Sequence, residues 1–472
     1  MDETQISTIV QRVLDELKKN GAPQPAAAAP GEDGLFDDME AAIDAAQAAQ
    51  KALSDMTLEN RKEIIAAIRK TGLENADEIA RQTVEETGMG NVADKAAKMK
   101  VACTKTPGVE DLDTVAWSGD HGLTVVEMAP FGVIGAITPS THPVPTLFNN
   151  AIGMIAAGNS AVVNPHPGAK NVSNRGVQLL NRAVQSAGGP ANLITSVRNT
   201  TMETGTLLFN HPKINLLCIT GGPGVVRAAM KAPKRAICAG PGNPPVVVDE
   251  TADLAGAAES IILGATFDNN LLCISEKTMV VVESVAEDFK RRLVERGAFE
   301  LTTSQMDALA GIVFRDGGKG AEEIVVNRDY VGRDAQVLAR AINVEIPSGT
   351  KMLFGETAPD HPFVRAEQMM NCLPLLRAPD WQKAIETARV AENFFRHTAI
   401  MHSKNVERLT RMGKIMDCTL FVKNGPSVAG VGVGGEGYMT HSMASPTGEG
   451  ITSARTFTRM RRCTMVDYLR IV

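Results

Sequence analysis

The sequence predicts an α/β protein made of two doubly wound, Rossmann-like α/β domains. Short β-branched runs alternate with helical segments in two successive blocks of the chain, a pattern typical of parallel sheets covered by helices. The 472 residues are 44% hydrophobic but only 4% aromatic. This composition favours tightly packed helices and strands and disfavours a protein that binds nucleic acid by stacking on its bases.

The N-terminal residues stand apart from this alternation. Between Ile6 and Leu17, apolar residues recur at helical spacing with charged residues between them, which predicts an amphipathic helix over residues 1–20. A flexible Pro/Ala/Gly linker follows over residues 21–34. Such a short helix needs a partner surface for its apolar face. The pattern leaves open whether that surface belongs to this chain, to a sister subunit or to a different protein.

The first α/β domain is predicted over residues 35–234. Helices are expected first, over 41–53, 60–70 and 75–86, and this block ends at Gly88 and Gly90. The alternation then predicts strands at 123–128, 132–138, 160–164, 193–197 and 214–220, and helices at 147–157, 172–187 and 204–209. Sheets of this type bind ligands at the carboxyl ends of their strands.

The second α/β domain is predicted over residues 235–428. Its expected strands lie at 245–249, 278–282, 351–354, 398–401 and 419–423. Residues 429–472 remain as a C-terminal return segment, which opens with a glycine-rich loop.

Charge and cysteine content exclude several classes of protein. A net charge of −6 offers no electrostatic attraction to DNA or RNA. The arginines near the C-terminus (Arg455, Arg459, Arg461 and Arg462) are interpreted as ion-pair or inter-subunit residues. Seven cysteines without a C-x-x-C pair argue against a disulfide framework or a metal site, so reduced thiols and a cytoplasmic location are expected. No apolar run is long enough to span a membrane, and no secretory signal precedes the first domain.

Cys273 is the cysteine with the strongest local claim to reactivity. Asp268, Asn269 and Asn270 interrupt an apolar stretch just before it, and such residues favour turns and helix caps. At a junction of this kind, backbone N–H groups can lower a thiol pKa and hold an oxyanion. The alternative interpretation, a buried inert thiol, fits Cys218 and Cys238, which sit in apolar strands.

Two glycine segments follow predicted strands and could line a ligand cleft. Thr220, Gly221 and Gly222 lie between a strand and a helix, where helix-start N–H groups can bind phosphate. Ala239 and Gly240 open a Gly/Pro loop before the next strand. Neither segment is a G-x-G-x-x-G fingerprint, so each remains either a phosphate-binding loop or a tight turn.

In order and spacing, these segments resemble the aldehyde dehydrogenase superfamily from about residue 36 to residue 472. The matching segments are Pro130–Gly135, Thr138 with Pro139, Ala157–Ser160, Thr220–Gly222, Phe267–Asn269 with Cys273, and Glu367. The resemblance implies that Cys273 is the nucleophile, that Glu367 binds the nicotinamide ribose of NAD, and that Thr220, Gly221 and Gly222 line its pyrophosphate. The hairpin at 115–129 and the C-terminal tail resemble subunit-bridging elements, which implies a small β oligomerisation element and a homodimer or homotetramer.

Departures from the hydrolytic members indicate a coenzyme-A-acylating branch. Those members carry Glu-Leu-Gly-Gly-Lys where this chain has Ala239–Asn243, so the water-activating Glu is replaced by Ala239. They carry Lys-Pro-Ser-Glu where this chain has Asn164, Pro165, His166 and Pro167. A thiol needs less activation than water does, so coenzyme A can discharge the acyl-enzyme without that base.

Further segments are similar to the acylating enzymes of bacterial microcompartments, which act on propionaldehyde or acetaldehyde. These are Thr106–Glu110, Pro446–Gly450 and Thr452–Phe457. The resemblance implies coenzyme A and NAD as the cofactors and a shell protein as the partner of residues 1–18. In many relatives an Asn helps to hold the oxyanion after Thr138 and Pro139. Here Thr141 and His142 are the alternatives, and a purely structural role for His142 stays open. The competing hypotheses are a hydrolytic dehydrogenase and a non-catalytic adaptor of the shell.

Overall fold

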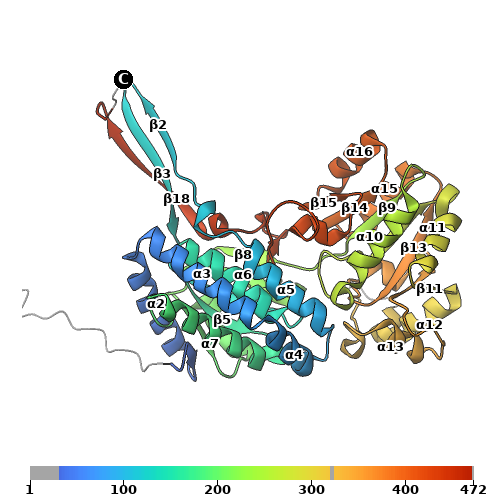
Figure 1. The fold of residues 1–472 in the computed structure, drawn as a ribbon, viewed down its shortest axis with the longest axis horizontal. Coiled ribbons are helices and arrows are strands. Elements are labelled where there is room, and N and C mark those ends of the chain that lie inside the picture. Colours follow the sequence, from blue (N-terminus) through green and yellow to red (C-terminus); the bar gives the residue numbers. More distant parts are fainter. Residues whose placement is uncertain (1–30, 319–323, 470–472) are drawn as a thin grey trace, which may run out of the picture.

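The computed structural model describes residues 31–318 and 324–469. Two lobes lie side by side, and a long arm of strands projects from one of them (Figure 1). Each lobe contains a parallel sheet, so the predicted α/β fold class is confirmed. The predicted helix at 1–20 and most of the predicted linker at 21–34 lie outside the described residues.

The first lobe is built around a six-stranded parallel sheet of order β1-β6-β5-β4-β7-β8. Its strands are β1 (Leu35–Phe36), β4 (Val133–Thr138), β5 (Ser160–Pro165), β6 (Ile194–Val197), β7 (Leu216–Thr220) and β8 (Ala236–Ala239). Alternate residues of β4 belong to different cores: Ile134 packs into one and Val133 into the other. Both faces of the sheet are therefore buried, as a doubly wound topology requires.

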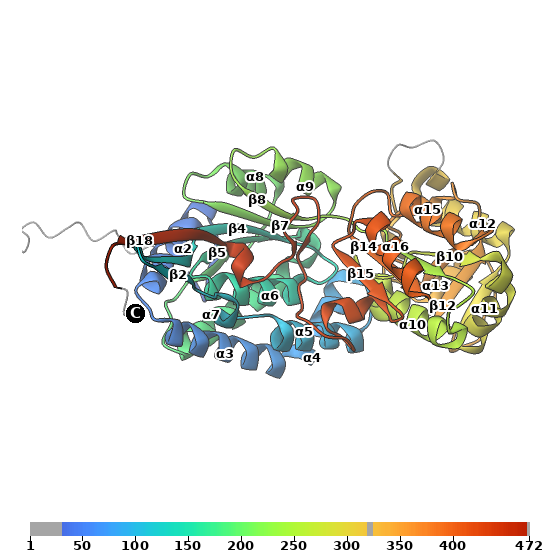
Figure 2. The same ribbon diagram turned by 90° about the horizontal axis from the view of Figure 1, so that it is seen from above.

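Helices cover these two faces in separate layers (Figure 2). One face is covered by α2 (Met39–Ser54), α8 (Met202–Asn210) and α9 (Pro223–Met230). The other is covered by α6 (Pro143–Ala156) and α7 (Lys170–Ser186), with α3 (Leu58–Glu74), α4 (Ala76–Thr87) and α5 (Val92–Lys105) outside them. The short helices η1 (Val109–Asp111) and η2 (Pro167–Ala169) complete this lobe.

The second lobe holds a seven-stranded parallel sheet of order β11-β12-β13-β10-β9-β14-β15. Its strands are β9 (Pro245–Val248), β10 (Thr278–Val282), β11 (Ala298–Leu301), β12 (Met352–Glu356), β13 (Cys372–Ala378), β14 (Thr398–His402) and β15 (Leu420–Lys423). Its α-helices are α10 (Leu254–Thr266), α11 (Glu283–Glu295), α12 (Thr303–Val313), α13 (Ala335–Ala341), α14 (Pro362–Arg365), α15 (Trp381–Ala391) and α16 (Val406–Met416). Its short helices are η3 (Phe267–Asn270), η4 (Arg315–Gly318), η5 (Arg328–Tyr330) and η6 (Ser427–Val431).

The arm is a three-stranded antiparallel sheet that joins distant parts of the chain. The hairpin of β2 (Val115–Gly119) and β3 (Gly122–Pro130) pairs with β18 (Thr458–Val466), from Thr458 opposite Pro130 to Val466 opposite Gly122. Between the second lobe and the arm, the returning chain forms β16 (Met443–Ala444), β17 (Gly450–Ile451) and η7 (Ala454–Phe457). The N-terminal and C-terminal halves of the chain are thus joined by main-chain hydrogen bonds.

The structure corrects some expectations in detail. β8 pairs with β7, so the first sheet extends beyond residue 234, where the domain boundary was predicted. The chain changes sheets between Ala239 and Pro245, because the Gly/Pro segment between them cannot continue a ladder. Gly88 does end α4 in a left-handed conformation, but Asn91 caps a further helix, α5, which was not anticipated. Strands β8, β11 and β13 were not anticipated either.

Asn159 fastens the return of the chain to the first lobe. Its Oδ1 accepts hydrogen bonds from the N–H groups of Phe131 (2.8 Å) and Gly132 (2.9 Å), and its Nδ2 donates to the carbonyl of Phe457 (2.9 Å). The side chain is fully buried. The amide therefore satisfies main-chain groups of two segments, at Gly132 and at Phe457, that lie about 325 residues apart in the chain.

Replacing Asn159 by Ala should destabilise the protein by about 2–4 kcal/mol, because two buried N–H groups and one carbonyl lose their partners. Asn159→Asp keeps both acceptor contacts but turns a buried carboxylate oxygen toward the carbonyls of Met154 and Phe457, so a loss of at least similar size is expected at neutral pH. Denaturant unfolding of the two variants and the parent measures this. An Asn159→Ala variant as stable as the parent would contradict the assigned role.

Candidate active site

Cys273 lies in a turn between η3 and β10 that has an unusual backbone. Asp268, Asn269 and Asn270 all have left-handed conformations, with φ of 49°, 54° and 66°. Asn and Asp tolerate this region better than other residues with a side chain. The predicted turn before Cys273 is thus present, and its polar residues are the ones that make it possible.

Hydrogen bonds from buried side chains hold this turn in place. Asn270 Nδ2 donates to the carbonyl of Ala265 (2.8 Å) and to that of Glu276 (3.0 Å). Lys277 Nζ donates to Asn270 Oδ1 (2.6 Å) and to the carbonyls of Asn270 (3.1 Å) and Leu272 (3.0 Å). The main chain around Cys273 is therefore fixed independently of any ligand.

The thiol of Cys273 is strongly influenced by its surroundings. Burial and, to a smaller extent, the charge of Glu367 raise the pKa of Cys273 to about 12, while Lys277, the residue's own N–H and Lys98 oppose that rise. The residue as a whole is half-buried. A thiol in this state rests protonated, and nearby positive charge or a proton acceptor is what would release its nucleophile.

Four segments meet at Gly242, in the loop that joins the two sheets. The N–H of Gly242 donates to Glu367 Oε1 (3.1 Å). A Cβ placed on Gly242 would lie 2.4 Å from the carbonyl oxygen of Cys273 and 3.0 Å from the ring of His397. Only glycine fits this position, because a side chain would collide with the turn that carries the thiol. Cys273, Glu367 and His397 are thereby brought together.

His397 is a candidate that the sequence did not reveal. The residue is buried, and burial followed by the charge of Lys277 lowers the pKa of His397 to about 3. Its Nδ1 shares a hydrogen bond with Thr398 Oγ1 (2.9 Å), and its Nε2 has no hydrogen-bond partner among the described residues. A neutral imidazole with a free nitrogen can accept a proton. The histidine precedes β14 without any motif, so only the tertiary structure places it here.

The structure places Thr141 and His142 in the loop between β4 and α6. Thr141 Oγ1 and His142 Nδ1 share a hydrogen bond of 2.9 Å. The His142 ring lies 5.1 Å, centroid to centroid, from that of His441, and burial lowers the pKa of both histidines. Both rings are therefore neutral at pH 7. His441, from the C-terminal return, is a second residue that sequence reasoning missed.

The expected cofactor residues gather at the carboxyl ends of β4, β5, β7 and β8. Thr138 lies opposite Pro165, and Thr220 lies opposite Ala239. Pro139 and Gly240 follow β4 and β8 directly. Thr138 Oγ1 is buried and lacks a partner within the part of the chain described, whereas Thr220 Oγ1 bonds Ser442 Oγ at 2.7 Å. Helix α9 begins beyond Gly221 and Gly222, and a Cβ on Gly222 or Gly224 would meet nothing within 4 Å. This helix start is open to a ligand.

One further expected cofactor segment lies at the end of β5 and the start of η2. It consists of Asn164, Pro165, His166 and Pro167. Asn164 Oδ1 accepts a hydrogen bond from Thr204 Oγ1 of α8 (2.7 Å). His166 Nδ1 accepts one from the N–H of Gly168 (3.0 Å) and so caps η2, which begins at Pro167. Burial and then the charge of Arg328, from the second lobe, lower the pKa of His166. Both polar side chains thus already make local contacts.

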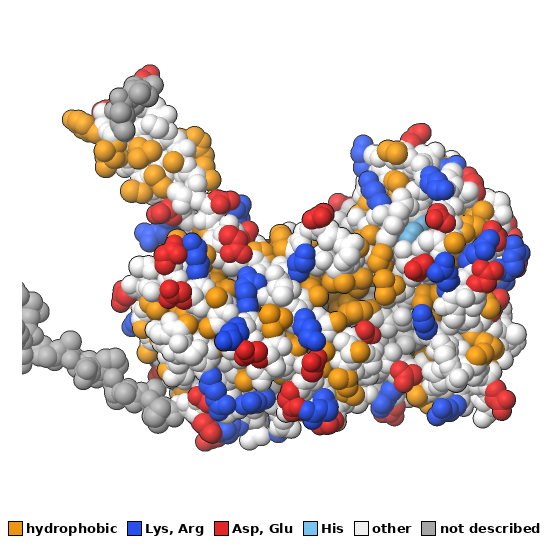
Figure 3. All heavy atoms as spheres, viewed as in Figure 1, with side chains coloured by type: hydrophobic (Ala, Val, Ile, Leu, Met, Phe, Trp, Pro, Cys, Tyr) orange, Lys and Arg blue, Asp and Glu red, His pale blue; other side chains and the backbone are white. Residues whose placement is uncertain are grey.

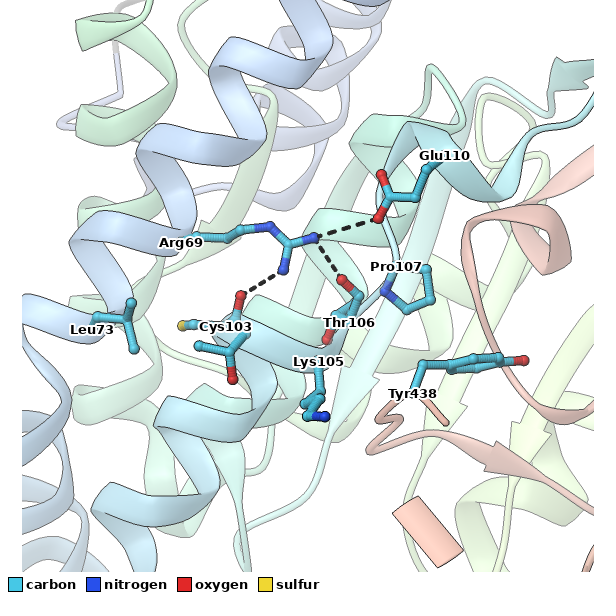
Figure 4. A pocket seen from close by; sticks show the side chains of 9 residues that line it. Arg69, Leu73, Cys103, Lys105, Thr106, Pro107, Glu110 and Tyr438 are labelled. Atoms are coloured by element: carbon cyan, nitrogen blue, oxygen red, sulfur yellow. Dashed lines mark hydrogen bonds and ion pairs between the residues drawn. The ribbon is translucent and has the colours of Figure 1, made fainter. Parts of the chain in front are cut away.

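A pocket of about 580 Å³ lies between α3, α5 and the C-terminal return (Figure 4). Arg69 donates across it to the carbonyls of Cys103 and Thr106, both at 2.6 Å, and Tyr438 closes one side. Cys273 is not among its lining residues. Asn149 connects this pocket to the candidate active site. The Nδ2 of Asn149 donates to Thr106 Oγ1 (2.8 Å), and its Oδ1 accepts a hydrogen bond from the N–H of His441 (3.0 Å).

Glu276 is a buried carboxyl group between the nucleophile turn and η6 of the second lobe. It accepts hydrogen bonds from the N–H of Ser427 (2.9 Å) and from Ser427 Oγ (2.8 Å). Burial raises the pKa of Glu276 to about 7, and the bonds to Ser427 and the charge of Lys277 limit that rise. Gly264 leaves the room for it, because a Cβ there would collide with the carboxylate.

Residues 31–318 and 324–469 contain no candidate metal site and no candidate membrane-spanning helix. Histidine, cysteine and acidic side chains form no group of three or more that could hold a metal ion in this part of the chain. In the same residues, every helix is too short or too polar to cross a membrane.

Residues 29–308 match the sequence profile of the aldehyde dehydrogenase family. An acetaldehyde dehydrogenase (acetylating) of Escherichia coli is 47% identical, over 100% of both chains. The solved propionaldehyde dehydrogenase from the fucose utilisation bacterial microcompartment of Clostridium phytofermentans is 48% identical, with a TM-score of 0.90 over 93% of this chain and 100% of that one. The Rhodopseudomonas palustris propionaldehyde dehydrogenase, solved with bound CoA and an acylated cysteine, is 44% identical, with a TM-score of 0.90 over the same shares of the two chains.

The raised pKa of Glu276 makes stability depend on pH. Between about pH 4.5 and pH 7 the folded chain holds a proton that the unfolded chain has released, so this group makes the free energy of unfolding fall as pH rises through that range. Glu276→Gln should remove this contribution. The free energy of unfolding of the variant should therefore rise relative to that of the parent by up to roughly 3 kcal/mol between pH 5 and pH 7. Urea unfolding at several pH values measures it, with the exposed Glu63→Gln as control. If the difference in the free energy of unfolding between variant and parent is the same at pH 5 and at pH 7, the prediction is refuted.

Proposed function

The chain belongs to the aldehyde dehydrogenase family, and from this premise we propose that it is a CoA-acylating aldehyde dehydrogenase. It would convert a short aliphatic aldehyde, propionaldehyde or acetaldehyde, together with CoA and NAD, into acyl-CoA and NADH. The observation that carries the proposal is the convergence of Cys273, Glu367 and His397 at Gly242. The relatives described above, acetylating or carrying CoA and an acylated cysteine, support the acylating branch.

NAD would bind at the carboxyl ends of β4, β5, β7 and β8. The open N-terminus of α9 at Gly221 and Gly222 would hold the pyrophosphate, because its N–H groups lack partners in the helix. The unpartnered Thr138 Oγ1 can serve as a donor or an acceptor there, next to Pro139. Glu367 would hold the nicotinamide ribose. NAD supplies the hydride acceptor when bound, and CoA is the second substrate of the same cleft, beside Asn164, Pro165, His166, Pro167 and Gly240.

Cys273 would carry out the first half of the reaction. Its sulfur adds to the aldehyde carbon as its proton leaves. His397 Nε2, which lacks a partner among the described residues, is the proposed acceptor, and it is a weak base in the resting protein because burial lowers the pKa of His397 to about 3. The oxyanion is held by the N–H of Cys273 and by a donor at Thr141 or His142. Loss of hydride from this carbon leaves an acyl thioester on Cys273.

Discharge of the acyl group would require a second thiol. The sulfur of CoA adds to the thioester carbon and gives up its proton. Cys273 leaves as a thiolate, which takes up that proton and becomes a thiol again. Ala239 ends β8 as a buried apolar residue. Because it offers no carboxylate, water at that point would find no general base, whereas a thiol needs far less activation.

The arm and the N-terminal residues would serve assembly. Apolar side chains gather on the arm in the space-filling view (Figure 3). Strands β2 and β18 of the arm carry the exposed Val115, Trp117, Met460 and Met465. Such a surface suits pairing with another subunit, so we propose a homodimer or homotetramer. For residues 1–18 we propose attachment to a microcompartment shell protein, inside a compartment of the cytoplasm. One solved relative comes from such a compartment.

Cys273→Ala should reduce turnover below about 1% of the parent, since loss of a nucleophile removes covalent catalysis. NADH formation from propionaldehyde, with and without CoA, measures this, and mass spectrometry identifies the product. The parent should form propionyl-CoA only when CoA is present. Propionate formed at an equal rate without CoA would favour a hydrolytic enzyme, and a wholly inactive parent would favour an adaptor. Cys463→Ala, which removes an exposed thiol of the arm, is the matched control.

Deleting residues 1–18 should leave the specific activity unchanged and abolish co-purification with shell proteins, because an amphipathic helix on a linker binds a partner without contributing to the reaction centre. The full chain is the control in both assays. Continued co-purification of the shortened chain would show that another surface attaches it.

A further inference from the structure

A buried cluster of three charged side chains connects the two lobes beside the reaction centre. Asp268 Oδ2 accepts hydrogen bonds from Lys98 Nζ (2.6 Å) and Lys95 Nζ (3.0 Å). The side chains of Lys95, Lys98 and Asp268 are 4%, 1% and 0% exposed. Both lysines belong to α5 of the first lobe, and Asp268 belongs to the turn that carries Cys273.

The surrounding chain is shaped to admit this carboxylate. Asp268 Oδ1 accepts a hydrogen bond from the N–H of Asn91 (3.0 Å), and the N–H of Asp268 donates to Asp94 Oδ2 (2.8 Å). A Cβ on Gly90 would lie 1.9 Å from Asp268 Oδ1, so Gly90, with φ of 72°, makes the approach possible. The start of α5 is therefore built around Asp268.

Lys95 makes a third contact, which reaches the proposed oxyanion site. Its Nζ donates to the carbonyl of Thr141 at 3.0 Å while it also binds Asp268. One ammonium group thus joins the loop that carries Thr141 and His142 to the turn that carries Cys273. These segments come from different lobes, and the relative position of sulfur and oxyanion donor depends on how they are joined.

The charges of the lysines also act on the reacting groups. Lys98 is among the groups that lower the pKa of Cys273, together with Lys277 and against Glu367. Burial, then His441 and both lysines lower the pKa of His142. Burial lowers the pKa of Lys95 to about 8, and Asp268 and Asp94 oppose that fall. Buried ion pairs often add little to stability, because desolvation offsets their attraction. Stability alone therefore gives little reason for two lysines at this place.

We propose that Lys95, Lys98 and Asp268 form a positioning cluster of the acyl-transfer site. Lys95 holds the Thr141 segment against the nucleophile turn, and Lys98, bonded to Asp268 at 2.6 Å, holds that turn from α5 and places positive charge beside it. The inference rests on the proposed function, and it assigns different tasks to the two lysines. Asp268 binds both ammonium groups, so replacing it would leave two buried cations without their carboxylate.

Single Lys→Met replacements separate the two tasks, because each leaves the other lysine paired with Asp268. Alkylation of Cys273 by iodoacetamide at pH 8.5, followed by peptide mass spectrometry, reports thiolate formation without any turnover. Lys98→Met should slow it about 3–10-fold, since the rate follows the thiolate fraction. Lys95→Met should lower kcat for acyl-CoA formation about 10–100-fold with little change in KM, through misplacement of Thr141. Lys100→Met, at an exposed position of α5, is the matched control.

The outcomes distinguish this inference from the proposed function. Thermal unfolding confirms that each variant is folded before its rates are compared. If both lysine variants alkylate and turn over like the parent, or lose only stability, the cluster is structural and the inference is overturned. If the parent forms no acyl-CoA yet Lys98→Met still slows alkylation, the proposed function fails while the charge effect at Cys273 stands.

Discussion

The turn at Asp268, Asn269 and Asn270 is the constraint on which the reaction centre depends. Three successive left-handed residues cost of the order of 1–3 kcal/mol each unless their surroundings hold them. Each side chain is bound to a different part of the fold. Asp268 binds α5, and Asn270 binds the end of α10 and Lys277. Asn269 Nδ2 binds the carbonyl of Gly332 (3.0 Å) and Asp334 Oδ1 (2.9 Å). The position of Cys273 therefore reflects the packing of both lobes.

Electrostatics and packing are coupled at this site. Burial raises the pKa of Cys273 and of Glu276 and lowers that of His397, so uncharged forms of these groups are favoured in the resting protein. Lys277 lies at the centre, because its ammonium group holds the turn through hydrogen bonds and also shifts the pKa values of its neighbours. A site of this kind develops charge only when its groups react, and fixed donors such as main-chain N–H groups can then stabilise that charge.

The chain passes between its two lobes more than once. Two of these connections contribute residues to the candidate active site. The Gly/Pro loop from Ala239 to Pro245 connects the sheets and places Gly242 against the Cys273 turn. The C-terminal return brings His441 to His142 and Ser442 to Thr220, and then continues into β18 of the arm. The return segment that carries His441 and Ser442 to the proposed cofactor edge is thus continuous with β18, one strand of the arm.

The sequence by itself determined the fold class, most of the strands, and the turn at Cys273. Periodicity and turn-forming residues act locally, so they can be recognised without a structure. Strands β8, β11 and β13 and helix α5 were missed, because their composition alone does not distinguish them from neighbouring segments. Only the tertiary structure decided which side chains surround the thiol. His397, His441, Lys95 and Lys98 lie in no motif, and they reach the centre because parallel strands and lobe packing bring distant residues to one edge.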